Sequence, residues 1–254
     1  MLPFLENLAV VLLSVGVVLC VACYLNRKLE ASARRRANGV NGWQLSIIGS
    51  IYAVVLGFML SDAWLAYQTA IGDVRNEAVA ALIVYRTSAL LPPACEVELQ
   101  DATQTYIQTV IDVEWPAMER HSGVYPGGAV VDTMWNIANH CNARNMEPAH
   151  ESVFRALESL QTSRDSRIED ANGHLPVIMW NVLIFGAVIV IGSSCLLGNE
   201  KHSVHCFHVA SLTILIAVTL LAVLDLDRPF DGATRIAPVA FHVVQGDISR
   251  QTAR

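Results

Sequence analysis

The stretch "WQLSIIGSIYAVVLGFMLS" (residues 43–61) decides the fold of this chain, because none of its nineteen residues is charged. A helix of about 20 apolar residues is long enough to cross the hydrocarbon core of a bilayer. Three further stretches of this character occur at 8–25, 176–198 and 207–224. A soluble protein can bury one helix this apolar in its core, but not usually four. The sequence therefore predicts an all-α integral membrane protein with four transmembrane helices.

The composition agrees with this class. Hydrophobic residues make up 53% of the chain and charged residues only 16%, whereas soluble domains carry about a quarter. The first apolar stretch follows "MLPFLE" (1–6), which has no basic residue, and no small-x-small cleavage site comes after it. A signal peptide needs both features, so we expect the first stretch to remain as a membrane anchor.

The distribution of basic residues predicts the orientation. The short loop 26–42 contains five Arg or Lys residues and one acidic residue, which is typical of a cytoplasmic loop. Both termini and the long segment 67–175 are then expected outside the cytoplasm. That segment carries seven Arg, no Lys and fifteen acidic residues, a formal charge of −8, which is consistent with an outside location.

Three regions are expected along the chain. Residues 1–66 form a transmembrane hairpin, 67–175 a helical extramembrane domain, and 176–254 a second transmembrane hairpin with a charged carboxyl tail. Apolar residues at three- and four-residue spacing predict that the second membrane helix continues to about residue 91. The same spacing predicts further helices over 96–115, 129–145 and 148–171, with a loop from Pro116 to Gly128.

The cysteines leave two interpretations open. Cys95 and Cys141 both lie in the segment expected outside, where they can form a disulfide, but spacing alone equally allows two free thiols. The other cysteines lie in or beside apolar helices, where Cys usually acts as a small apolar residue. They are Cys20, Cys23, Cys195 and Cys206.

Neither cysteine nor histidine spacing predicts a metal site. "CVAC" (20–23) lacks the second pair that zinc-binding CxxC motifs have. His202, His205 and His208 are better explained as an interfacial turn facing water than as a metal or pH-sensing site. We therefore expect no metal and no cofactor.

Charged residues follow the fourth membrane helix in "LDLDRPFDG" (224–232). Charge at a membrane boundary is costly unless it is hydrated or paired. We therefore predict an ion-pair clasp that locks helices together, in which the two aspartates pair with arginines close in depth; direct contact with a transported ion is the alternative. The residues of this clasp are Arg75, Arg167, Asp225, Asp227 and Arg228.

Small residues form a stripe along the second membrane helix: Ser46, Gly49, Ser50, Ala53, Gly57 and Ser61. Such a stripe lets helices approach closely in lipid. It can also line a narrow pore, with a constriction made by Ile51, Val54 or Phe58 and with Asp62 at the outer mouth. The sequence leaves both interpretations open.

Several of these stretches resemble one known family. They are "YAVVLGFML" (52–60), "DVRNEAVAALIVYRTSALLP" (73–92), "SRDSRIEDANGHLPVIMWNVLIFGAVIVIG" (163–192) and "LDLDRPFDG" (224–232), and together they resemble the bestrophin-like family of bacterial membrane proteins. The family's double arginine before the third span is replaced here by Arg164 and Arg167. The positions that match its pattern are Arg75, Glu77, Arg86, Arg167, Pro176, Trp180, Asp225, Asp227, Arg228, Pro229, Phe230 and Gly232.

The resemblance implies a function. Bestrophins are oligomeric anion channels, so it implies a homo-oligomeric ion channel of the bacterial inner (cell) membrane, with anions favoured and the lipid bilayer and inorganic ions as partners. The alternative is a membrane scaffold, or an accessory or sensor subunit whose outer helical domain binds a partner or ligand. The sequence has no glycine-rich phosphate loop, no HExxH and no GxSxG, so an enzyme is not expected, and neither is a nucleic-acid partner.

Overall fold

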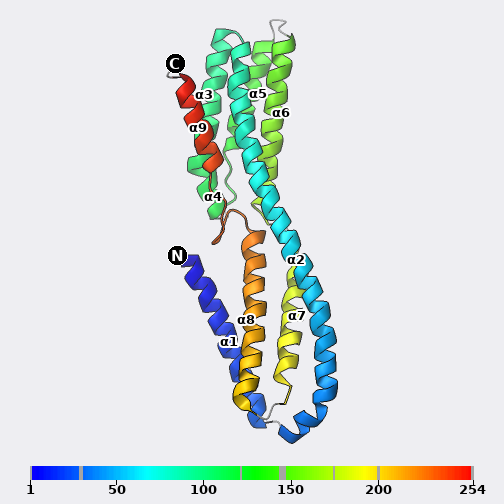
Figure 1. Cartoon of the computed structure of the whole chain (residues 1–254). Coiled ribbons are helices and arrows are strands. Elements are labelled where there is room, and N and C mark those ends of the chain that lie inside the picture. The colour runs from blue at the N-terminus through cyan, green and yellow to red at the C-terminus, as the bar shows by residue number, and fades with distance from the viewer. Residues whose placement is uncertain are drawn as a thin grey trace. The chain divides into compact units, whose positions relative to one another are not determined.

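The computed structural model describes residues 2–28, 31–120, 122–142, 147–173, 175–198 and 201–252. Within these ranges the regular structure is helical and contains no strand, which confirms the predicted all-α class (Figure 1). The α-helices are α1 (Leu2–Lys28), α2 (Ala31–Thr87), α3 (Pro93–Thr109), α4 (Trp115–Glu119), α5 (Gly127–Asn142), α6 (Glu147–Asp170), α7 (Val177–Cys195), α8 (His202–Asp227) and α9 (Val239–Thr252).

Four of these helices are long and apolar enough to cross a membrane, as predicted. The spans are Leu5–Lys28, Asn38–Leu90, Val177–Cys195 and His202–Asp227, and they belong to α1, α2, α7 and α8. The chain divides into two compact units. We call residues 1–65 and 174–227 the membrane unit, and residues 66–173 and 228–254 the helical unit. Helix α2 contributes to both, as expected from a stretch that contains no proline.

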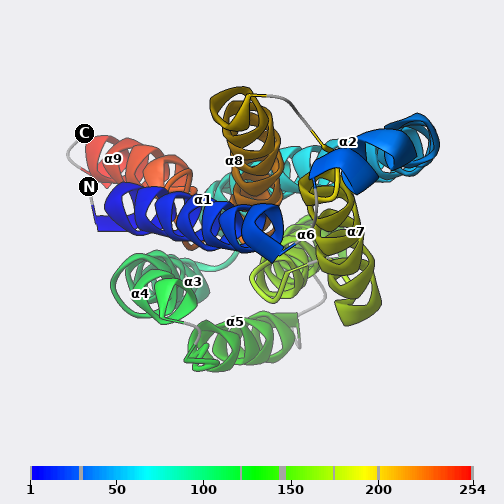
Figure 2. The same cartoon turned by 90° about the horizontal axis from the view of Figure 1, so that it is seen from below.

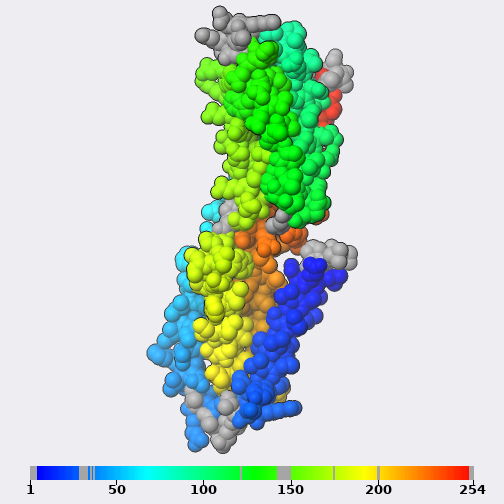
Figure 3. All heavy atoms as spheres, turned by 180° about the vertical axis from the view of Figure 1, so that it is seen from behind, coloured from blue at the N-terminus to red at the C-terminus, as the bar shows by residue number. Residues whose placement is uncertain are grey.

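In the membrane unit, α8 contacts both α1 and α7, and Figure 2 shows these helices from below. On the face drawn in Figure 3, α8 is seen between α1 and α7. Helix α2 docks on α7 through Tyr52, whose hydroxyl donates a hydrogen bond of 3.0 Å to the carbonyl oxygen of Leu183. Gly186 makes this approach possible, since a Cβ there would lie 2.4 Å from the Tyr52 ring.

In the helical unit, the second half of α2 shares one apolar interior with α3, α5 and α6. Its interior is apolar and draws on every one of these helices, with Val84, Leu99, Met134 and Leu157 all fully buried. Helices α5 and α6 begin and end within three residues of the bounds that the sequence predicted. Apolar periodicity was therefore a sound guide to these helices, because each buries one stripe against its neighbours.

The expected loop at Pro116 is wrong. Helix α3 passes into one π-helical turn, Val110–Glu114, and then into α4, which has Pro116 in its first turn. Proline has no N–H group, and its ring displaces the carbonyl four residues earlier, so an ordinary α-helix would break here. The wider π turn, in which the Trp115 N–H bonds to the Val110 carbonyl, carries the chain past this point as a helix.

The carboxyl tail, which we expected after the second membrane hairpin, belongs to the helical unit. Residues 228–254 cluster with the helical unit and not with the second membrane hairpin. Phe230 and Phe241 are buried and meet the Trp115 ring edge-on, at centroid distances of 5.6 and 5.7 Å. Aromatic side chains bury the largest apolar area per residue, so these two rings hold the tail and α9 on the helical unit.

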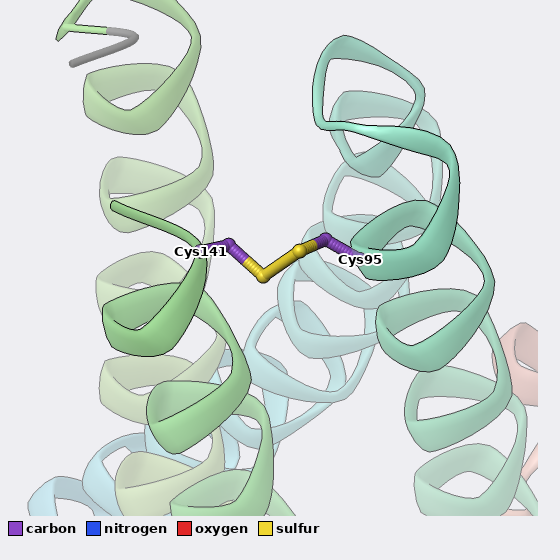
Figure 4. The surroundings of a disulfide bond; sticks show 2 residues. All are labelled: Cys95 and Cys141. Carbon is purple, nitrogen blue, oxygen red and sulfur yellow. A yellow bond between two sulfur atoms is a disulfide. The ribbon is translucent and has the colours of Figure 1, made fainter. Parts of the chain in front are cut away.

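A disulfide joins Cys95 on α3 to Cys141 on α5 (Figure 4). The sulfur atoms are 2.08 Å apart and the Cα atoms 6.3 Å apart. The bond links two neighbouring helices of the helical unit across 46 residues of sequence. Of the two interpretations that the sequence left open, the structure contains the disulfide.

Candidate functional site

Charged side chains lie inside the helical unit, where apolar residues are expected. Glu77 on α2, Glu114 in the π turn and Arg167 on α6 have no exposed surface, and Arg164 on α6 is 8% exposed. Burying a charge costs several kcal/mol unless it is paired and hydrogen-bonded. We call these residues the buried charge network, and it is the most unusual feature of this unit.

Arg167 is the centre of the network. Its guanidinium donates to both carboxylate oxygens of Glu77, at 2.5 Å from Nε and 3.0 Å from Nη2. Nη2 also donates to Glu114 Oε2 at 2.6 Å, and Nη1 contacts the sulfur of Met118 at 3.2 Å. A two-pronged pair of this kind fixes both partners in one geometry. Arg167 therefore ties α6 to α2 and to the π turn.

Glu114 is held from three sides. In addition to Arg167, it accepts hydrogen bonds at Oε1 from Arg164 Nη2, at 2.9 Å, and from the backbone N–H of Gly127, at 2.8 Å. Gly127 begins α5, and a Cβ at this position would lie 2.7 Å from Glu114 Oε1. A glycine is therefore required for the amide to reach the carboxylate. Arg164 Nη2 also donates a hydrogen bond of 3.1 Å to the carbonyl oxygen of Tyr125.

Two aromatic residues enclose the network. The Tyr106 hydroxyl donates to Glu77 Oε1, and the Tyr106 side chain is fully buried. The Trp115 ring lies 5.5 Å from the Arg167 guanidinium carbon, within the range of a cation–π contact. These rings exclude water, so the charges attract each other more strongly than they would at the surface.

Burial and neighbouring charges shift the pKa values of Glu114, Arg167 and Tyr106. Burial by itself would raise the pKa of Glu114, but the guanidiniums of Arg167 and Arg164 hold that pKa below its usual value. Burial would lower the pKa of Arg167, yet the neighbouring Glu77 raises it instead. Burial and the negative charge of Glu77 raise the pKa of Tyr106 well above its usual value. These shifts favour the charged forms of Glu114 and Arg167 and the neutral form of Tyr106.

The predicted clasp is corrected at Arg167. Its guanidinium is engaged by Glu77 and Glu114, two residues of its own unit, and not by the aspartates of "LDLDRPFDG". Asp227 accepts a hydrogen bond of 2.9 Å from the backbone N–H of Leu175, just before α7. Asp225 lines a groove of about 480 Å³ between α1 and α8. Arg75 and Arg228 are exposed.

Part of "LDLDRPFDG" follows the fourth span as a turn. The Ile236 N–H donates to the Pro229 carbonyl at 2.8 Å, and Gly232 has a positive φ of 86°, which favours glycine. Phe230, between them, is the buried ring that packs on Trp115. This part of the motif therefore anchors the tail of the helical unit.

Sequence reasoning missed the glutamates as partners, although a signal was present. Glu77 falls between Val74, Ala78 and Ala81 on the stripe that predicted the buried face of the helix. Glu114 directly follows the apolar residues of the next predicted helix. A charged residue on an apolar stripe is a sign of a buried ion pair, since it is tolerated only where a partner meets it.

The small-residue stripe of α2 lies on the surface of the single chain. Its members Ser46, Ser50, Ala53, Gly57 and Ser61 are exposed, as is Asp62 beyond them. The opposite face of α2, which includes Tyr52, Leu56 and Ala63, is buried against the rest of the membrane unit. The stripe therefore faces away from the chain's own helices.

The chain and its fold match known proteins. The model of the bestrophin-like domain matches residues 10–241. The chain belongs to the bestrophin-like family. Among solved structures, this bestrophin-like protein is similar to a bacterial bestrophin homologue from Klebsiella pneumoniae, with a TM-score of 0.70, 12% identity, and coverage of 96% of this chain and 97% of that chain. A point variant of that homologue gives a TM-score of 0.71 at 11% identity, covering 96% and 99%.

At this identity the likeness to the solved structures shows the fold alone. No curated protein sequence matches this bestrophin-like chain. Because the chain covers nearly the whole length of the Klebsiella homologue, the membrane unit and the helical unit both belong to the shared fold.

Proposed function

We propose that this bestrophin-like protein is a homo-oligomeric ion channel whose pore is lined by α2, and that anions are the favoured ions. The observation that carries the proposal is the exposed small-residue stripe on α2. Residues 46, 50, 53, 57 and 61 fall within an arc of about 80° when successive residues turn by 100°. They form one continuous face along the membrane span.

This face requires a partner from outside the chain. In the most apolar window of the α2 span only 6% of the residues are buried, against 22% for α7 and for α8. Serine and glycine gain little from contact with lipid tails, whereas they allow close approach of a second helix or passage of an ion. Both uses call for further copies of this chain, because its own helices pack on the other face of α2.

Large apolar side chains beside the stripe supply the narrow part of the pore. Ile51, Val54 and Phe58 are 62%, 58% and 68% exposed in the single chain. Rings of such residues, one from each subunit, form a constriction that is closed by loss of water. Asp62, one turn beyond Phe58, lies at the outer mouth. Its charge opposes the entry of anions, so the preference for anions rests on the family's kinship with bestrophins.

The proposed orientation places both termini outside the cytoplasm of a bacterial inner membrane. Basic residues gather at the adjoining ends of α1 and α2, where Arg27, Lys28 and Arg36 are exposed. The disulfide in the helical unit supports this orientation, because disulfides persist outside the reducing cytoplasm. Reporter fusions after residues 36 and 130 test it, and cytoplasmic activity from the second fusion overturns it.

A planar-bilayer recording of the purified protein, with ion substitution, tests the channel. The Phe58→Ala variant should conduct several-fold more than the wild type, since it removes a ring of the constriction. Phe185→Ala is the matched control, because Phe185 on α7 is 67% exposed but lies away from the stripe. Absence of current from folded, reconstituted protein would overturn the channel and favour the scaffold or accessory role. Equal effects of the two substitutions would overturn α2 as the pore helix.

A further inference from the structure

We propose that Cys23, His202 and Cys206 bind a zinc ion that joins the ends of α1 and α8. Cys23 lies in the last two turns of α1, and His202 is the first residue of α8. Their ligand atoms and the sulfur of Cys206 all lie within 4.8 Å of one another. The three residues belong to the membrane unit, and the proposal does not depend on the channel function.

Sequence spacing explains how the ligands share one place. His202 and Cys206 are four residues apart, so they lie one above the other on the same face of α8. Cys23 faces them from α1, which packs along α8. Cys23 and Cys206 are both free thiols, so their sulfurs are available to a metal.

The distances fit a tetrahedral zinc ion. With Zn–S bonds of about 2.3 Å and Zn–N bonds of about 2.05 Å, the sulfur and nitrogen ligands of a tetrahedron are about 3.5 Å apart. His202 Nε2 lies 3.6 Å from the Cys23 sulfur and 3.5 Å from the Cys206 sulfur. Two edges of the tetrahedron are therefore already at their final length. Only the sulfur–sulfur edge, about 3.8 Å in a zinc site, is left to adjust within the 4.8 Å limit.

A neighbouring side chain orients the histidine. The Asn26 side-chain nitrogen Nδ2 lies 2.9 Å from His202 Nδ1. Turning the amide over exchanges its nitrogen and oxygen, and in the zinc-bound protein we infer that the oxygen takes this place and accepts a hydrogen bond from Nδ1–H. The lone pair of Nε2 then points toward the two sulfurs. A partner of this kind on the second ring nitrogen is what metal-bound histidines usually have.

The ligand set selects the metal. Two thiolates and an imidazole are soft and borderline ligands, which suit zinc and exclude calcium and magnesium as the preferred ions. Binding releases the two thiol protons to solvent, so the dication is balanced by two thiolate charges. The fourth position of the tetrahedron is left for water. Because the ligands come from both helices, the ion works as a cross-link between α1 and α8.

Zinc titration of the detergent-solubilised full-length protein, kept free of oxygen so that Cys23 and Cys206 stay reduced while the Cys95–Cys141 disulfide stays intact, tests the site against a chromogenic chelator. We expect one zinc per chain for the wild type, and at least a tenfold weaker affinity for Cys23→Ser and for Cys206→Ser. Cys20→Ser is the matched control, because Cys20 is an exposed cysteine on the same helix outside the cluster, and it should bind like the wild type. Cobalt(II) should give the visible bands of a tetrahedral thiolate site.

A further variant protects the test against misfolding. His202→Cys retains three ligands, so it should still bind cobalt, with a stronger thiolate-to-cobalt charge-transfer band than the wild type. Zinc bound equally by wild type, Cys23→Ser and Cys206→Ser would show an adventitious ion and overturn the site. A reduced wild type that binds no zinc would also overturn the site. This holds even if the protein binds copper(I), or if Cys23 and Cys206 form a disulfide in air.

Discussion

Replacement of Glu114 by glutamine tests the buried charge network. The side chains of Glu114 and Arg167 are both fully buried, and Glu114 also pairs with Arg164. Glu114→Gln leaves the interior with an excess positive charge and turns an amide N–H₂ toward guanidinium donors. Breaking a fully buried pair costs about 3–5 kcal/mol. At about 2–4 °C per kcal/mol for a chain of this size, the melting temperature should fall by roughly 6–20 °C.

The measurement is thermal unfolding of the detergent-solubilised protein followed by tryptophan fluorescence. Glu151→Gln is the control, because it removes a carboxylate from the Arg155–Glu151 pair, whose side chains are 73% and 64% exposed. An exposed pair contributes about 0–1 kcal/mol, so this variant should melt close to the wild type. A Glu114→Gln protein that melts as late as the control would refute the reasoning about burial.

A second substitution separates charge balance from packing. Arg164→Gln combined with Glu114→Gln restores equal numbers of acidic and basic groups in the network. The double variant should lose less stability than the sum of the two single variants, by about 0.5–3 kcal/mol. The two side chains share a hydrogen bond of 2.9 Å, so their effects should be coupled. Additive losses of stability would contradict this and show that they act independently.

Three further outcomes are expected from thermal unfolding. Reduction of the Cys95–Cys141 disulfide should cost about 4 kcal/mol of stability by the chain-entropy account, because the cysteines are 46 residues apart; an unchanged melting temperature with TCEP would contradict this. Gly186→Ala should cost about 1–3 kcal/mol, since its Cβ would lie 2.4 Å from a tyrosine ring, whereas Gly192→Ala meets nothing within 4 Å and should be harmless; equal losses would exclude the clash. The pKa of Glu114 is lowered from 4.5 in the folded protein, so the stability that its charged form contributes is complete above pH 4.5 and is lost as the pH falls below it. The melting temperature of Glu114→Gln should therefore drop less than that of the wild type between pH 5 and pH 3. Equal drops of the two melting temperatures would argue against this.

The sequence alone determined the membrane class and most helices. Uncharged runs of helix-spanning length identify membrane spans without any knowledge of packing, because the requirement to satisfy every backbone group in lipid is local. Apolar periodicity likewise located α5 and α6, since one buried stripe is a property of the helix itself. The paired prolines at 92–93 gave the end of α2 to within a few residues.

Only the tertiary structure decided which charged groups meet. The segment 67–175 holds fifteen acidic residues, so the sequence offered Arg167 many partners, and the choice of Glu77 and Glu114 depends on contacts across 90 and 53 residues. Pro116 marks the point at which an ordinary α-helix would break, but the sequence alone did not show that a π turn, which presents Glu114, would replace a loop there.

Long-range packing also decided the place of the tail and the grouping of Cys23 with His202 and Cys206. Cys23 lies 179 positions or more from His202 and Cys206 in the sequence, and neither "CVAC" nor the histidine spacing pointed from one helix to the other. Spacing within a helix fixes which residues share a face. Which faces then meet is set by the packing of whole helices, and this is why the pairing of sites was beyond the sequence.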